Sequence, residues 1–446
     1  AGLRVVELGT VVAGPFTASL LADLGADVIK VEPAGQGDVL RRVGPARDGV
    51  TALWGVSSRN KRCIGVDLKS PQGSGHMRRL LRDADVLVSN YRPGALARLQ
   101  LGPADLAALN PQLVHVSISG YGSPGPKSHL PGFGKIAEGM SGIVNLTGRP
   151  DEAPLYCGFS LGDTTTALFA ALGAVFSLHA RDRAGCAAPD VSIALYDALL
   201  RITEAQLIEA RTTGHPPARQ GTNYPYSDGR GGLWPRIVSA QADDGQWLAI
   251  LVTEDEAARR FVAEFGSGDP AGPAPPENFE AELRAWTGCR TPDAVRRDLA
   301  EFGMEVALVH DGQTLVDDPY MLARGDVLDV DVAGLGQLWV PGHIDPLMAA
   351  EAPRFHWAEL ADPEGIDWLA PRLPAVQEEC ADKALFADLV VVEITDTPGA
   401  SFAATLFADY GAATYILETA GAASGAKADA PALWTALARN KHSVIV

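Results

Sequence analysis

The feature of this sequence that most limits its fold is a strand–helix–strand pattern at the start of the chain. Residues 3–8 form a short β-rich apolar run, and residues 16–24 follow as an apolar helical segment that Gly25 ends. Residues 27–32 then form a second apolar run. Two strands joined by one helix in this way predict the opening of a doubly wound parallel α/β sheet.

The same pattern returns near the end of the sequence. Residues 389–393 resemble the first strand, and residues 402–412 resemble residues 16–26 in length, composition and order. Glu418 also falls where Glu32 does in the first pattern. We therefore expect a second strand–helix–strand unit in this part of the chain.

A further pair of blocks strengthens this expectation. An Ala-Leu-Trp block ahead of Arg-Asn-Lys occurs at residues 52–61 and again at residues 432–441. Two matched blocks in the same order predict that residues 386–446 are the start of a second copy of the fold, and that the native polypeptide continues into it. The alternative is a closing tail whose likeness to the start is coincidental. A single strand–helix–strand unit cannot bury its own faces, so this segment should dock on another surface.

The patterns between the two copies predict the domain organisation. Alternating strands and helices continue to about residue 225, which indicates a large α/β domain over residues 1–225. Two β-rich runs flank the hairpin signature at residues 243–245, and helical segments follow them. We expect a smaller α+β domain over residues 226–330. We expect residues 331–385 to comprise a segment that returns to the large domain and a linker.

Composition excludes several classes of function. The five cysteines are scattered without a Cys-x-x-Cys pair, and the histidines lack metal-ligand spacing, so we expect a metal-free protein of the reducing cytoplasm. The chain shows no signal-peptide pattern, and no apolar run reaches the roughly 18 residues that cross a bilayer. The formal net charge of −18 argues against nucleic acid or an anionic membrane as partner.

One acidic residue stands at a position where a carboxylate could do chemistry. Asp163 lies in a Gly-Asp-Thr-Thr-Thr sequence directly before an apolar helix predicted over residues 164–179. Asp is a favoured N-cap, which is a purely structural interpretation. A carboxylate at a helix N-terminus also stays ionised, can act as a covalent nucleophile, and has N–H groups beside it that can hold an oxyanion. The two interpretations are compatible.

Six short motifs connect the sequence to a known family. They lie at residues 12–15, 21–32, 59–62, 90–94, 117–122 and 190–192. On these motifs the sequence resembles the class III CoA-transferase family, which includes formyl-CoA transferase, carnitine CoA-transferase and 2-methylacyl-CoA racemase. The resemblance extends from residue 3 to about residue 346.

The resemblance implies a fold and a mechanism. The fold would be a doubly wound Rossmann-like domain with a small α+β domain, assembled as an interlocked homodimer or, in a tandem protein, as an intramolecular pseudo-dimer. The family's catalytic aspartate falls at Asp163, between the Leu-Thr-Gly segment at residues 146–148 and the strand at residues 190–192. CoA would pass from an acyl-CoA to a small carboxylic acid through an aspartyl anhydride and an aspartyl-CoA thioester. Coenzyme A would enter as a substrate, with no metal.

The resemblance also implies which residues contact CoA. Because CoA is a polyanion and the protein is acidic, cations must be concentrated at the site, and the first hundred residues contain several. The implied contacts are Val12, Ala13, Gly14, Pro15, Arg41, Asn60, Lys61, Arg62, Asn90, Tyr91 and Arg98.

Departures from the family's sequence patterns help to decide between its transferase and racemase members. Racemase members carry a His-Asp pair where this chain has Phe133-Gly134, and neither of these side chains can move a proton. An acyl-CoA racemase or isomerase is therefore the second alternative, and a CoA-binding subunit without turnover is the third. Residues 228–232 are a candidate for the mobile glycine loop of the transferases. The second copy has Ala400-Ser401 in place of Gly14-Pro15, so it is expected to have lost CoA affinity.

Overall fold

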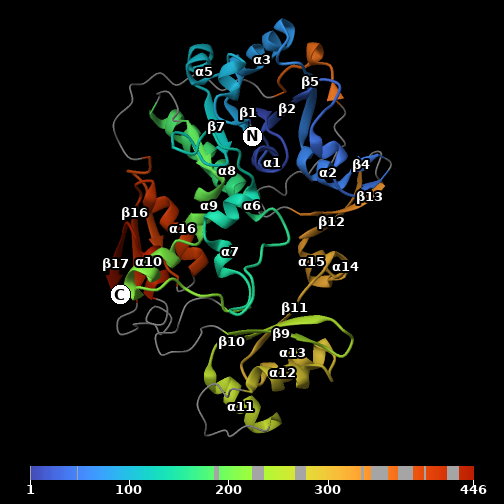
Figure 1. Ribbon diagram of the computed structural model, residues 1–446, viewed down its shortest axis with the longest axis vertical. Helices are drawn as coiled ribbons and strands as arrows, with labels where there is room; N and C mark the ends of the chain where they lie inside the picture. The colour runs from blue at the N-terminus through green and yellow to red at the C-terminus, as the bar shows by residue number, and fades with distance from the viewer. Residues whose placement is uncertain are drawn as a thin grey trace. The chain divides into compact units, whose positions relative to one another are not determined.

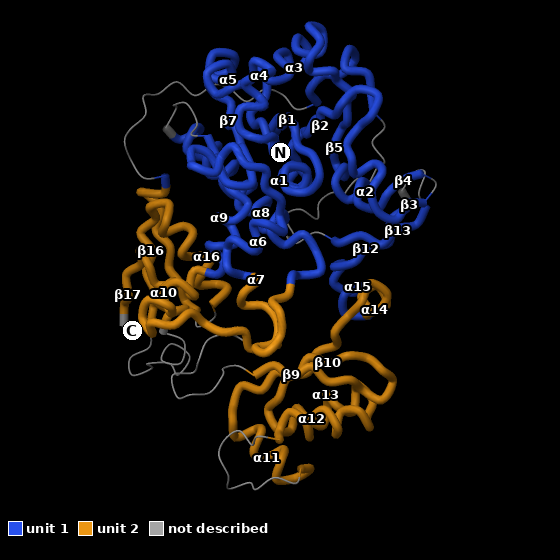
Figure 2. Tube along the Cα trace, in the orientation of Figure 1, with its two compact units in different colours: residues 1–143, 156–203, 319–385 blue, residues 144–155, 204–318, 386–446 orange. Residues whose placement is uncertain are grey.

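The computed structural model describes residues 2–47, 49–184, 190–223, 236–266, 278–332, 336–342, 360–369, 385–395, 398–418 and 431–445. The chain divides into two units (Figure 2). The first consists of residues 1–143, 156–203 and 319–385, and the second of residues 144–155, 204–318 and 386–446. The candidate glycine loop at residues 228–232 lies outside the described residues.

A seven-stranded sheet forms the centre of the first unit (Figure 1). In spatial order its strands are β14 (Leu360–Ala361), β5 (Lys61–Val66), β2 (Asp27–Pro33), β1 (Arg4–Leu8), β6 (Val86–Ser89), β7 (Val114–Ser119) and β8 (Val191–Ala194). Every pairing is parallel. The predicted doubly wound parallel sheet is confirmed.

Helices cover both faces of this sheet, which explains why its strands read as continuous apolar runs. Val5 and Val28 belong to the core on one face, together with residues of α1, α6, α8 and α9. Val6 and Ile29, one position further along, belong to the core on the other face, with residues of α3 and α5. Successive strand residues point to opposite faces, so both must be apolar. The helices are α1 (Ala13–Asp23), α3 (Pro71–Asp83), α5 (Pro103–Leu109), α6 (Gly134–Met140), α8 (Leu161–Ala184) and α9 (Leu195–Ile202).

Helix α8 is longer than the sequence predicted. Over Leu161–Arg183 it is long and apolar enough to cross a membrane, although 56% of its most apolar stretch is buried inside the protein.

Shorter elements complete the first unit. The remaining elements are η1 (Val39–Arg42), β3 (Ala46–Arg47), β4 (Val50–Thr51), α2 (Ala52–Ser58), α4 (Ala95–Arg98), α7 (Ile143–Leu146, at the unit boundary), α15 (Pro319–Arg324), β12 (Val327–Val332), β13 (Gly336–Pro341) and η2 (Pro363–Gly365).

The middle of the second unit is a three-stranded antiparallel sheet with helices packed on it. The hairpin predicted around residues 243–245 joins β9 (Arg236–Gln241) to β10 (Trp247–Val252), and β11 (Glu305–Leu308) pairs with β10. Phe261 is fully buried and makes edge-on ring contacts with Phe279, Trp286 and Phe302. The helices of this middle part of the unit are α10 (Ala205–Thr213), α11 (Asp255–Phe265), α12 (Phe279–Thr287), α13 (Pro292–Ala300) and α14 (Gly312–Asp317).

The C-terminal part of the second unit is a separate parallel sheet with the element order of the chain's beginning. It contains β15 (Val390–Glu393), α16 (Pro398–Asp409), β16 (Ala413–Glu418), α18 (Pro431–Leu437) and β17 (Lys441–Ile445). The strand order is β15-β16-β17, as the order in the first unit is β1-β2-β5. Val392 lies opposite Tyr415, just as Val6 lies opposite Ile29. The strand register is therefore shared as well.

Side-chain contacts repeat between the two segments. Lys61 Nζ donates to Glu7 Oε2 over 2.8 Å and to the carbonyl oxygen of Pro15 over 2.6 Å. Lys441 Nζ donates to Glu393 Oε2 over 2.7 Å and to the carbonyl oxygen of Ser401 over 2.8 Å. These contacts link the third strand to the first strand and to the first helical turn in both segments.

A second set of side-chain contacts also occurs in both segments. Arg59 Nη2 donates to Asp23 over 2.6 Å, and Arg439 Nη2 donates to Asp409 over 2.9 Å. The asparagine that follows each arginine also donates to the same aspartate and has a positive φ, 59° in the first segment and 57° in the second. Residues 390–445 thus share strand order, register, side-chain contacts and an uncommon backbone conformation with residues 4–66.

Candidate active site

The strand order of the large sheet predicts a ligand-binding crevice at its carboxyl edge. The chain leaves β1 toward β2 on one side and returns through β6 on the other, so the order reverses between β1 and β6. Ligands of open α/β sheets bind at such a reversal. Helix α8 leads into β8, which runs parallel to the other strands, so its N-terminus lies at the same edge as that of α1. The two helices pack against each other (Figure 1).

The turn between β1 and α1 is fixed at this reversal by Asn90, which follows β6. Asn90 Oδ1 accepts from the Thr10 N–H over 2.9 Å, and its Nδ2 donates to the Thr10 carbonyl oxygen over 2.7 Å. Val11 has a φ of 65°, an uncommon conformation for a β-branched residue. A Cβ on Gly14 would lie 3.0 Å from the Cα of Gly9, which is tighter than most Cβ contacts, so a side chain here would force the turn to shift. The result is a sharp turn held from both sides of the crevice.

The first turn of α1 begins at this edge, and the Ala13 and Gly14 N–H groups have no acceptor within the helix, while Pro15 has no N–H. Its N-cap is Val12, whose apolar side chain cannot accept a hydrogen bond from these groups. Helix N-termini of this kind bind anionic groups such as phosphate. The predicted contacts Ala13, Gly14 and Pro15 form this helical turn.

Two fully buried lysines hold the ends of the turn. Lys30 Nζ donates to Glu7 Oε1 over 2.6 Å and to the Gly9 carbonyl oxygen over 2.8 Å. Lys61, a predicted CoA contact, is also fully buried and bonds Glu7 and the Pro15 carbonyl oxygen. Burial lowers the pKa of Lys61 to about 8, against the attraction of Glu7. Lys61 therefore lies beneath the turn and supports its backbone.

Three other predicted contacts pair with carboxylates of the chain. Arg41 Nε donates to Glu32 over 2.7 Å, and its guanidinium lies 3.9 Å from the centre of the Trp54 ring. Arg62 Nη2 donates to Asp27 over 2.7 Å, and Asn60 donates to Asp23. These side chains stabilise the strand edge formed by β2 and β5.

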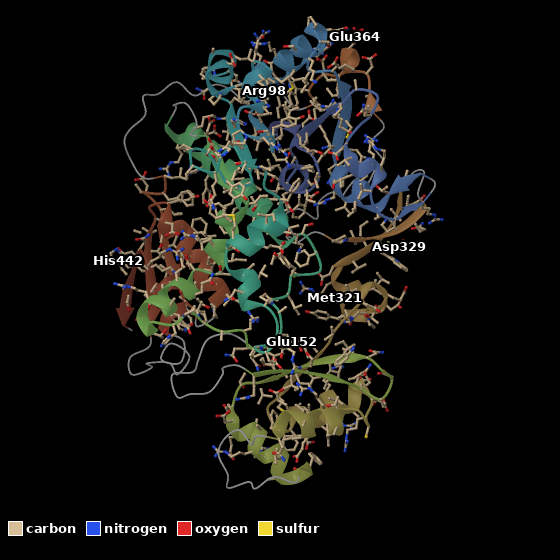
Figure 3. The ribbon with its side chains drawn as sticks, in the orientation of Figure 1. Arg98, Glu152, Met321, Asp329, Glu364 and His442 are labelled. Atoms are coloured by element: carbon tan, nitrogen blue, oxygen red, sulfur yellow. The ribbon has the colours of Figure 1, made fainter. Side chains whose placement is uncertain are left out.

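Two predicted contacts lie close after β6. Tyr91 is half-buried against the core that α3 and α5 share, and burial raises the pKa of its hydroxyl. Arg98 ends α4 and is exposed at the surface of the first unit (Figure 3). An exposed guanidinium can reach a soluble anionic ligand.

Asp163 lies inside the first turn of α8, where the sequence predicted an N-cap. Helix α8 begins at Leu161, and the Thr164 N–H donates to the Ser160 carbonyl oxygen over 3.0 Å. The helix starts earlier because Glu138 Oε1 accepts from the Gly162 N–H over 3.2 Å, which satisfies a first-turn donor from another helix. Asp163 is therefore not the N-cap residue that the sequence predicted, and its carboxylate interacts with its own backbone N–H in the first turn.

Helix α6 packs against this carboxylate. A Cβ on Gly134 would lie 2.1 Å from Asp163 Oδ2, so only glycine leaves room for the Asp163 side chain at this contact. Glu138 is 1% exposed, and its Oε2 lies 2.9 Å from Lys135 Nζ. Lys135 Nζ also donates to the carbonyl oxygens of Cys157 over 2.8 Å and Phe159 over 2.7 Å. The Lys135–Glu138 pair thus holds the loop that leads into α8.

The surroundings of Asp163 change its acidity. Burial, followed by the negative charge of Glu138, raises the pKa of Asp163 to about 6, while Lys135 opposes this rise. At neutral pH the carboxylate is mostly ionised and more basic than an exposed aspartate. These are the properties of a carboxylate nucleophile near its working pH.

The sequence prediction missed Lys135 and Glu138. Their signal was a pair of opposite charges spaced by three positions on a short, otherwise apolar helical segment directly after Gly134. No group of three or more His, Cys, Asp or Glu side chains suited to a metal ion occurs among the residues that the structure describes.

Comparison with known proteins identifies the family. The family model of CoA-transferase family III matches residues 1–364. The chain is 36% identical over 399 residues to succinyl-CoA–D-citramalate CoA-transferase of Chloroflexus aurantiacus, covering 87% of this chain and 93% of the relative. It is 32% identical over 369 residues to succinate–glutarate CoA-transferase of Agrobacterium fabrum, covering 79% and 90%. The crystal structure of a CAIB/BAIF family protein from Brucella suis superposes with a TM-score of 0.68 at 29% identity, covering 81% of this chain and 96% of that one. The chain therefore belongs to CoA-transferase family III and is a CoA-transferase.

Proposed function

We propose that this protein transfers CoA from an acyl-CoA thioester to a carboxylic acid through covalent intermediates on Asp163. The observation that supports this most strongly is the Asp163 carboxylate itself, held in the first turn of α8 with its pKa raised to about 6 and packed against Gly134, where a Cβ would collide with it. The raised pKa makes the carboxylate a better nucleophile.

The reaction then has four balanced steps. Asp163 attacks the thioester carbonyl carbon, the C–S bond breaks, and CoA leaves as a thiolate while a mixed anhydride forms. The thiolate attacks the aspartyl carbonyl, which releases the donor carboxylate and leaves an aspartyl-CoA thioester. The acceptor carboxylate attacks this thioester, the C–S bond breaks to regenerate the thiolate, and a second mixed anhydride forms between Asp163 and the acceptor. Attack of the thiolate on the acceptor's acyl carbonyl gives the new acyl-CoA and restores Asp163.

CoA would lie against the crevice at the carboxyl edge of the sheet. We place its phosphates near the first turn of α1, over residues 12–15, and near the exposed guanidinium of Arg98. Asn90 and Tyr91 would form the neighbouring wall. The predicted contacts that pair with carboxylates near β2 and β5, together with buried Lys61, would act by fixing the backbone around the turn.

The relatives indicate a class of substrates. Their names pair succinyl-CoA with D-citramalate and mesaconate, and succinate with glutarate. We therefore propose succinyl-CoA as donor and a small dicarboxylic acid as acceptor, acting in the cytoplasm. The assembly would be a homodimer, or a pseudo-dimer within one chain.

A CoA-exchange screen tests this function. The purified chain is incubated with succinyl-CoA and, in turn, D-citramalate, mesaconate or glutarate, and mass spectrometry measures the new acyl-CoA. At least one acceptor should give product, and Asp163→Ala should lower the rate by about 10³-fold or more because the nucleophile is lost.

The control is Asp105→Ala. Asp105 is also a first-turn carboxylate, in α5, and accepts from the Gly102 N–H over 3.0 Å. Its removal should cost helix stability and leave the exchange rate unchanged. Full exchange activity in Asp163→Ala would refute the proposed role of Asp163.

A further inference from the structure

The C-terminal sheet exposes one apolar face. In β15, the alternate residues Val390 and Val392 are 62% and 54% exposed. Ile394, just beyond the end of this strand, is 78% exposed. Tyr415 in β16 and Val444 in β17 are 37% and 38% exposed. His442, opposite Tyr415 on the same face, stacks against the Tyr415 ring. Exposed aliphatic and aromatic side chains gathered on one sheet face mark an interaction surface.

The opposite face of the same sheet is covered. Glu393, Thr414 and Ile416 are at most 7% exposed, and α16 and α18 lie on this side, since Lys441 reaches both Glu393 and the backbone of α16. The sheet therefore has one helix-covered face and one apolar face without such a cover among the described residues of this unit.

The first segment shows what such a face requires. By the shared register, Val392 and Ile394 correspond to Val6 and Leu8, and Tyr415 corresponds to Ile29. Val6, Leu8 and Ile29 are at most 1% exposed. The same side chain positions are thus fully buried in one segment and open in the other.

The cover of the first segment is a helix followed by a strand. Met77, Leu80 and Leu81 form the apolar stripe of α3 and belong to the core that contains Val6 and Ile29. The strand after this helix, β6, pairs in parallel with β1. In the C-terminal sheet β15, the counterpart of β1, is an edge strand.

We propose that the face formed by Val390, Val392, Ile394, Tyr415 and Val444 binds a helix–strand unit of the α3–β6 type. An amphipathic helix packs its apolar stripe on this face, and an apolar strand pairs in parallel with the edge of β15. The bound unit would reproduce on the C-terminal sheet the arrangement that α3 and β6 have in the first segment. Hydrophobic burial and closure of the open strand edge both favour this docking.

The chain supplies its own probe for this surface. Lys61 corresponds to Lys441, so residue 66 corresponds to residue 446, and residues 67–90 can be appended after Val446 in the place they take after Val66. Ile394→Cys then reports on the face. With the appended segment, maleimide labelling of this cysteine, located by peptide mass spectrometry, should slow by about tenfold or more because the face is covered.

Two controls separate docking from other effects. A matched graft carries Met77→Glu, Leu80→Glu and Leu81→Glu in the appended copy only, and should leave the cysteine reactive. Leu369→Cys, at a side chain that is 77% exposed in the first unit, should label at the same rate with and without the graft. Far-ultraviolet circular dichroism and the thermal transition confirm that each chain is folded.

Three outcomes would overturn the proposal. The first is a folded grafted chain whose cysteine labels as fast as in the ungrafted chain. The second is equal protection by the polar graft. The third is protection in the ungrafted chain that grows with protein concentration, which would assign the face to a second copy of this chain.

Discussion

At the scale of single residues, Asp163 has to remain ionised where little water can solvate it. Burial and the charge of Glu138 favour the protonated acid, and Lys135 favours the carboxylate. The outcome is a pKa of about 6, near enough to neutrality that the base form dominates while its basicity is increased. The same Lys135–Glu138 pair anchors the loop before α8 and the Gly162 N–H, so it affects both the position and the charge of Asp163, the nucleophile that we propose.

Glu138→Gln should separate these two effects. The amide can still accept from the Gly162 N–H, but it carries no charge, so the pKa of Asp163 should fall. Because activity requires ionised Asp163, the acidic limb of the kcat/KM profile lies at its pKa and should move to lower pH, by up to about one unit. The measurement is a pH profile of CoA exchange for wild type and variant.

The control for this shift is Glu209→Gln in α10. Burial also raises the pKa of Glu209, but this residue belongs to the other unit. Its replacement should leave the acidic limb where it is in the wild type. An acidic limb in Glu138→Gln that stays in place or moves to higher pH would show that Glu138 does not set the charge of the nucleophile.

At the scale of elements, the turn between β1 and α1 is held by side chains that are distant in the sequence. Asn90 makes two hydrogen bonds with the Thr10 backbone, and Lys30 and Lys61 bond the carbonyl oxygens of Gly9 and Pro15. The strained backbone at Val11 persists because these contacts fix it from both sides.

Asn90→Ala should loosen this turn. The loss of two hydrogen bonds to a half-buried backbone costs about 1–2 kcal/mol of unfolding free energy. Since we place the CoA phosphates at this turn, the KM for acyl-CoA should rise about tenfold, with a smaller change in kcat. Steady-state kinetics and thermal unfolding measure both quantities.

Asn110→Ala is the matched comparison. Asn110 donates to the carbonyl oxygens of Leu81 and Ala84 over 3.0 and 2.8 Å, at the opposite edge of the sheet from the crevice. It should lose similar stability without a change in KM. Equal KM values for the two variants would remove the turn from the CoA site.

Local patterns predicted most elements and missed the contacts between them. The strands and the helix over residues 4–33 follow from apolar runs and from Gly25, all of which are local signals. The start of α8 could not be predicted in this way, because Glu138, 24 positions away, satisfies the Gly162 N–H. The resemblance implied Lys61 as a CoA contact, and no local signal in the sequence showed that Glu7 would lie opposite this lysine in the folded sheet.

At the scale of the whole molecule, the two related segments differ where the first one supports its proposed CoA site. Glu7 binds two buried lysines, Lys30 and Lys61, whereas Ile416 stands in the second segment at the position of Lys30. Ala400 likewise replaces Gly14, which makes a close backbone contact in the first turn. The strand framework is thus shared, and the features that we assign to CoA binding occur in the first segment.

The central claim is that Asp163 is the covalent nucleophile, and trapping its acyl or thioester adduct tests this most directly. The full chain is incubated with an acyl-CoA that it turns over in the exchange assay, hydroxylamine is added, and the tryptic peptides are mapped by mass spectrometry. We expect a hydroxamate at Asp163 that requires acyl-CoA and is absent from Asp163→Asn. Turnover of that acyl-CoA with Asp163 unmodified, or with the hydroxamate at Glu138 instead, would contradict it.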